Sequence, residues 1–147
     1  MELFGVESGP RIARLHCIHV PGQYGHYRWF SASCSSDTLV AMTYQYPDQS
    51  VRLHRLRGDR LEELAHIHLK DLIRLVWLAD RLIVTDWEGS KDSHAVIELE
   101  VSDTRLERRR ELISTSEHIN VSRLCAVNDE LAIFDFNSRN ILLYSLA

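Results

Sequence analysis

Residues 11–20, RIARLHCIHV, return 49 positions later as residues 60–69, RLEELAHIHL. The two stretches align without gaps and share an opening arginine, an inner leucine and a closing Ile-His pair followed by an apolar residue. A weaker third copy follows after a further 45 positions; it begins at residues 103–106, DTRL, and there Arg109 replaces the inner leucine. A period of about 40–50 residues indicates an array in which each repeat is one supersecondary unit.

A second motif, apolar-x4-Asp-x-Leu, repeats with similar spacing at residues 32–39, 75–82 and 124–131. Each copy predicts a strand, a tight turn at the aspartate and a second strand. The apolar spacing within residues 68–82 also fits one face of a helix. The repeat decides between the two, because it places a turn at Asp80 inside that segment and therefore favours two strands.

Elsewhere the chain alternates apolar and polar residues in short runs that are rich in β-branched and aromatic side chains. This pattern predicts an all-β fold in one domain over residues 1–147, made of units with four antiparallel strands each. We expect a first unit at 28–34, 39–46, 51–56 and 60–69, a second at 72–78, 82–87, 95–101 and 105–113, and a third at 120–126, 131–136 and 140–146. Residues 11–20 are then an outer strand with no partners before it, and the third unit lacks its outer strand.

The first full unit resembles a WD repeat, the blade of a β-propeller. It has the pair Gly25-His26, then a strand, a turn at Asp37, a second strand, and Asp48 before the third strand. The Trp-Asp pair of that family is replaced by His54-Arg55, and at the corresponding places by Glu98-Leu99 and Tyr144-Ser145. The resemblance covers about 120 residues as a blade rhythm. It implies a degenerate WD-repeat-like propeller of about three blades that binds protein partners.

Closed propellers have about 4–8 blades, so three blades need completion. Two chains in a head-to-tail twofold arrangement would close a six-bladed ring if each lent residues 11–20 to the last unit of the other. We therefore expect a homodimer. The alternatives are a fragment of a longer propeller and completion by a different subunit.

Composition narrows the class of partner and the compartment. The net charge is −4, which argues against a nucleic-acid binder that depends on bulk positive charge. No apolar run approaches the roughly 18 residues of a membrane span, and the first residues lack the features of a secretory signal. The odd number of widely spaced cysteines, Cys17, Cys34 and Cys125, predicts buried free thiols. We expect a cytoplasmic or nuclear protein that binds neither nucleic acid nor membrane.

Candidate catalytic and metal sites are sparse. His66 and His68 share one face of a strand, but no third ligand repeats with them, so we expect structural or surface histidines and no metal or cofactor. The carboxylates of Asp86 and Asp135 occupy equivalent positions, which favours a structural turn or strand-edge role over paired acid-base chemistry with Glu88 or Glu117. We predict that the chain is not an enzyme.

Arg74 and Arg123 also occupy equivalent positions, near the start of an inner strand. Facing a central channel, they would hold an acidic tail or a phosphate. The alternative is that they pair with neighbouring acids such as Asp86 and Asp135.

The loops at one end of the units are the predicted binding surface, because a rigid scaffold presents them and aromatic side chains anchor protein contacts. We predict a non-enzymatic protein-interaction scaffold; the alternatives are a carbohydrate-binding propeller lectin and, behind it, a propeller hydrolase. Trp29 and Trp87 also fit a blade core. The candidate partner-binding residues are Tyr24, His26, Tyr27, Trp29, Lys70, Asp71, Trp87, Glu88, Lys91, His94, His118 and Arg139.

Overall fold

The short alternating runs of the sequence become strands. A computed structural model describes residues 2–6, 12–17, 32–34, 39–44, 49–69, 72–87, 93–102 and 104–145. Within these ranges the one helical turn is the 3-10 segment η1, Thr115–Glu117, and every other regular element is a β-strand. In the same ranges no helix is long and apolar enough to cross a membrane.

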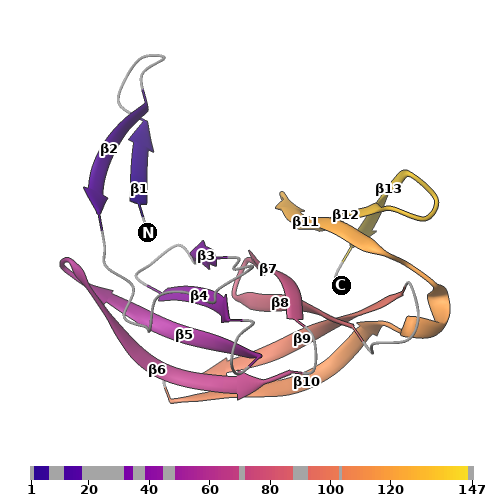
Figure 1. The fold of residues 1–147 in the computed structure, drawn as a ribbon, viewed down its shortest axis with the longest axis horizontal. Helices are drawn as coiled ribbons and strands as arrows, with labels where there is room; N and C mark the ends of the chain where they lie inside the picture. The colour runs from indigo at the N-terminus through magenta and orange to yellow at the C-terminus, as the bar shows by residue number, and fades with distance from the viewer. Residues whose placement is uncertain are drawn as a thin grey trace.

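Eleven of the strands form three antiparallel sheets in which chain order equals strand order (Figure 1). The first sheet holds β3 (Ala32–Cys34), β4 (Leu39–Tyr44), β5 (Ser50–Arg57) and β6 (Arg60–His68). The second holds β7 (Leu72–Leu78), β8 (Arg81–Trp87), β9 (His94–Ser102) and β10 (Arg105–Ile113), and the third holds β11 (Val121–Val127), β12 (Glu130–Asp135) and β13 (Asn140–Ser145). The prediction of an all-β chain built from antiparallel sheets of three to four strands is confirmed.

The N-terminal residues differ from the expectation. Strand β2 (Ile12–Cys17) pairs with an additional strand, β1 (Glu2–Val6), in a separate two-stranded sheet. The sequence predicts no strand before residue 11, because the five residues ELFGV have no counterpart in the repeat and are too short to show a clear alternation.

The turns explain why residues 68–82 are not helical. Leu78 pairs with Arg81, so Ala79 and Asp80 alone form the turn between β7 and β8. Asn128 and Asp129 form the same two-residue turn between β11 and β12. Ala79 and Asn128 have positive φ values of 53° and 55°, as the first position of a tight hairpin turn requires. The prediction of strand, turn and strand is confirmed here.

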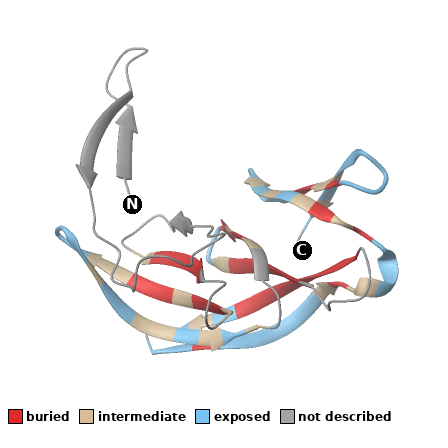
Figure 2. Cartoon of the chain, in the orientation of Figure 1, coloured by how far each residue is buried: buried red, intermediate tan, exposed pale blue. Residues whose placement is uncertain are grey.

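The second sheet is the middle layer of the molecule. A cluster that includes Ala41 and Leu53 of the first sheet packs against Leu82 and Val84 of the second. The opposite face of the second sheet carries Ile83 and packs against a cluster of the third sheet that includes Leu131 and Ile133. Strand β7 contacts both β3 and β11, and β6 contacts β10, so successive sheets face one another (Figure 2). Burial on both faces is why β9 has six consecutive buried residues.

Candidate functional site

The predicted loop surface is only partly described. Tyr24, His26, Tyr27, Trp29, Lys70, Asp71, Glu88 and Lys91 lie outside the described residues, and Trp87 is described only as the last position of β8. His118 and Arg139 are exposed and occupy turns with positive φ. The side-chain amide of Asn137 donates to the carbonyl of His118 at 3.0 Å, so these turns meet at one end of the third sheet.

Asp135 organises that end of the sheet. Its carboxylate accepts backbone N–H groups of Asn120 at 2.9 Å, Asn137 at 3.1 Å and Ser138 at 3.1 Å. Burial acts to raise the pKa of Asp135, but these bonds and one from the Ser138 hydroxyl outweigh it, and the pKa lies below its usual value. The carboxylate therefore has a structural role in holding the turn, as its position in the repeat predicted.

His94 joins the second sheet to the third. Its ring Nδ1 accepts the backbone N–H of Val121 at 2.8 Å, and its own backbone N–H donates to the carbonyl of Ile119 at 2.7 Å. The residue is buried, and burial, followed by the positive charge of Arg74, lowers its pKa. A ring nitrogen accepts a hydrogen bond only when the imidazole is neutral. His94 is therefore a buried link between the two sheets, and it offers little surface to a partner.

Arg74 and Arg123 lie close together, because both side chains donate to the same backbone carbonyl. Arg74 Nε donates to the carbonyl of Ser122 at 3.3 Å, and Arg123 Nη1 donates to the same carbonyl at 2.9 Å. Burial, followed by the charge of Arg123, lowers the pKa of Arg74. The two guanidinium groups gather positive charge where the inner strands β7 and β11 adjoin, and Asp135 is engaged elsewhere.

A buried carboxylate lies on the face of the second sheet that is turned to the third. Glu98 is 1% exposed, and its neighbours Ile97 and Leu99 belong to the core on the other face. Arg109 Nη1 donates to Glu98 Oε1 at 2.8 Å, Arg110 Nε donates to Oε2 at 2.6 Å, and Arg81 Nε lies 3.9 Å from Oε1. The guanidinium groups are half exposed, so the cluster holds fixed positive charge at the surface.

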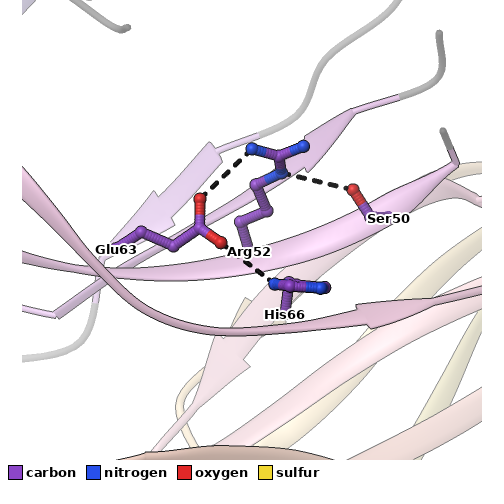
Figure 3. Close-up of polar contacts among 4 residues, drawn as sticks. All are labelled: Ser50, Arg52, Glu63 and His66. Atoms are coloured by element: carbon purple, nitrogen blue, oxygen red, sulfur yellow. Dashed lines mark hydrogen bonds and ion pairs between the residues drawn. The ribbon is translucent and has the colours of Figure 1, made fainter. Parts of the chain in front are cut away.

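The outer strands of the first sheet carry a second polar network (Figure 3). Arg52 donates to the Glu63 carboxylate at 3.2 Å and lies 3.4 Å from the Ser50 hydroxyl, while His66 Nδ1 lies 3.0 Å from the other Glu63 oxygen. His66 and His68 make an edge contact at 5.4 Å, so they share a face as predicted. These groups neutralise one another, and exposed pairs of this kind contribute about 0–1 kcal/mol.

The third sheet presents apolar side chains to solvent. Ile141 and Leu143 of the outer strand β13 are 70% and 61% exposed, and Val127 at the end of β11 is 46% exposed. Cys125, next along β11, is a free and exposed thiol. The prediction of three buried thiols is therefore wrong for Cys125, because it lies on a sheet face that no other described sheet covers.

A hollow of about 200 Å³ is lined by Leu78, Ala79, Asp80, Arg81 and Asp129 at the adjacent hairpin turns, which is below the roughly 300–1,000 Å³ of ligand pockets. No group of three His, Cys, Asp or Glu residues is placed to hold a metal ion in the described ranges.

Sequence reasoning missed the Glu98 cluster, although a signal was present. Arg109 stands where the repeat has Leu64, and a charged residue in an otherwise apolar inter-sheet position needs a buried partner. No sequence pattern indicated that His94 links two sheets, because its hydrogen bonds join residues that are far apart in the chain. Comparison of the chain with family models, curated proteins and solved structures found no match.

Proposed function

We propose that this chain is a non-enzymatic protein-interaction scaffold, a WD-repeat-like half-propeller that closes a ring with a second copy of itself. Each copy would lend its N-terminal residues to the third sheet of the other, giving six sheets around one axis.

The layering of the sheets supports this proposal. The inner strand β7 adjoins both β3 and β11, and the fourth strands β6 and β10 adjoin each other on the outside. Blades of a propeller are stacked in this way, with first strands inside and last strands outside.

One observation carries the proposal: the third sheet has three strands in the described chain, whereas the first and second have four. Its outer strand β13 has no neighbour on one side in that part of the chain, and its Ile141 and Leu143 are among the most exposed apolar residues. Soluble proteins protect such edges and patches, and pairing with another strand is the direct way to do so.

The test is the absolute mass of the purified chain by light scattering over a dilution series. The chain has a mass of 17.0 kDa, and we expect a stable species of twice that mass. A variant without residues 1–20 should be a folded monomer, because it retains all three sheets and loses the lent strands.

Circular dichroism of the truncated variant is the control for folding. A wild-type chain that remains a folded monomer at every concentration would contradict self-association. A dimer that survives removal of residues 1–20 would contradict closure by the N-terminal residues.

A further inference from the structure

The outer strands of the first and second sheets carry a β-bulge at the same repeat position. In β6 the pairing runs from Glu63 with His54 to Ala65 with Leu53, so Leu64 is the extra residue. In β10 it runs from Arg108 with Leu99 to Arg110 with Glu98, so Arg109 is the extra residue. A bulge turns consecutive side chains toward one face of a sheet, and this lets Arg109 and Arg110 both reach Glu98.

The two bulges carry opposite chemistry. In the first sheet the three positions are Leu53, Leu64 and Ala65, and all three pack in the core shared with the second sheet. In the second sheet the same positions are Glu98, Arg109 and Arg110. An apolar contact between sheets has thus been replaced by an ionic triad with an excess of positive charge.

The triad faces the place where a fourth strand of the third sheet would lie. Glu98 is on the face turned to the third sheet, since the alternate residue Val96 belongs to that core. In the first pair of sheets the fourth strands β6 and β10 contact each other. By the same stacking, a fourth strand added to β13 would lie against β10 beside Arg109 and Arg110.

We propose that β1 of a second copy, the strand that begins at Glu2, fills this position beside Arg109 and Arg110. The inference rests on the proposed self-association and specifies which N-terminal strand makes it. Residues 2–6, ELFGV, combine one acidic residue with apolar residues and a glycine. That composition matches an arginine pair beside an apolar core.

Charge separates β1 from the neighbouring segment. Residues 11–20 contain two arginines and two histidines and no acid, so they offer the arginine pair no counter-charge. Arg109 and Arg110 each use one nitrogen for Glu98, and a guanidinium has five N–H donors. Because the buried carboxylate holds both groups in place, a second carboxylate binds without the full cost of ordering them. The hairpin of β1 and β2 pairs with no other described sheet, and two-stranded hairpins are marginal alone.

The experiment measures the dimer dissociation constant by analytical ultracentrifugation for the wild type, Glu2→Lys and Glu7→Lys. Glu7 lies beyond β1 in the chain, so Glu7→Lys is a matched control with the same change of charge. We expect Glu2→Lys to weaken the dimer at least about tenfold and Glu7→Lys to change it less than about threefold. The neutral triple variant Glu98→Gln/Arg109→Gln/Arg110→Gln should weaken it by a similar factor.

Complementation sharpens the test. A mixture of Glu2→Lys with the triple variant contains one intact pair of strand and triad, so it should form more dimer than Glu2→Lys does alone. If the triple variant does not fold, the comparison of Glu2→Lys with Glu7→Lys still decides.

The possible outcomes separate the two proposals. A wild-type chain that stays monomeric overturns both. A dimer that is unaffected by Glu2→Lys, or one that survives removal of residues 1–7 and is lost only on removal of residues 1–20, overturns the assignment to β1 and leaves self-association standing.

Discussion

At the scale of single residues, buried polar groups tie the sheets together. His94 bridges the second and third sheets with two short hydrogen bonds, and Glu98 fixes two arginines on the outer strand of its own sheet. Both residues are nearly inaccessible, so each protonation or substitution acts on the fold before it acts on any partner.

The buried, neutral imidazole of His94 predicts that the free energy of unfolding depends on pH. Because burial lowers the pKa of His94, protons bind the unfolded chain more readily than the folded one. The contribution of His94 to the free energy of unfolding is complete above the ordinary histidine pKa of 6.5, and it declines as the pH falls below that value. His54 shifts in the same direction, so the contribution of His94 is isolated by comparison with His94→Gln.

Urea unfolding at several pH values measures this effect. The variant should lose about 1–2 kcal/mol at pH 8, because the N–H of Val121 loses its acceptor in a buried place. The difference from the wild type should shrink toward pH 5. A constant difference would show that folding does not lower the pKa of His94.

The Glu98 cluster gives a second prediction. Glu98→Gln should destabilise the chain by about 1–2 kcal/mol, less than for a fully buried pair, because the two guanidinium groups are half exposed. The triple variant Glu98→Leu/Arg109→Leu/Arg110→Ala copies the first sheet and should regain most of that loss. Thermal unfolding at low protein concentration measures the stability of both variants. A triple variant that is less stable than Glu98→Gln would contradict the equivalence of these three positions with Leu53, Leu64 and Ala65 of the first sheet.

At the scale of elements, the hairpin turns set the strand register. Ala79 and Asn128 occupy equivalent first positions of two-residue turns, and both have positive φ. Alanine is strained there, whereas asparagine tolerates the left-handed region.

The turns therefore predict a contrast between two glycine substitutions. Ala79→Gly should raise the free energy of unfolding by about 0.5–1 kcal/mol, because it removes the strain at φ 53°. Asn128→Gly should change it by less, since asparagine already accepts φ 55°. Chemical denaturation compares the two variants, and an equal effect at both turns would argue against strain at Ala79.

The strands of the three larger sheets could be predicted because the repeat fixes their number and order, and the turn at Asp80 excludes the helix; β1 has no counterpart in the repeat and was not predicted. Which neighbouring sheet each strand residue packs against could be predicted only in part. Leu39 and Leu82 hold the same motif position, yet Leu39 packs toward the second sheet while Leu82 packs toward the first. A shift of one residue in a strand reverses its faces, and a motif that recurs in sequence does not exclude such a shift.

The candidate site was harder to predict for the same reason. The repeat gives Arg74 and Arg123 equivalent positions, but it did not predict that both donate to the carbonyl of Ser122. The burial of His94 accompanies its bonds to Ile119 and Val121, which lie far along the chain, and no local pattern encodes such contacts.

At the scale of the whole molecule, three sheets form a row with one exposed end. Ile141→Lys/Leu143→Lys should leave the stability of the monomer within about 0.5 kcal/mol, because both side chains are exposed. The same variant should weaken self-association, since lysine on an edge strand opposes pairing. Light scattering and thermal unfolding measure the two effects separately, and unchanged association would exclude β13 from the interface.

The position of the second sheet has a consequence for how the chain opens. In the described part of the chain, the second sheet packs on the first and on the third, so stability is approximately a sum over sheets and over adjacent pairs. The middle sheet takes part in both pairs, and the end sheets take part in one each. Amide protons of β8 and β9 should therefore exchange with solvent last, and the molecule should fray inward from the end that carries β13.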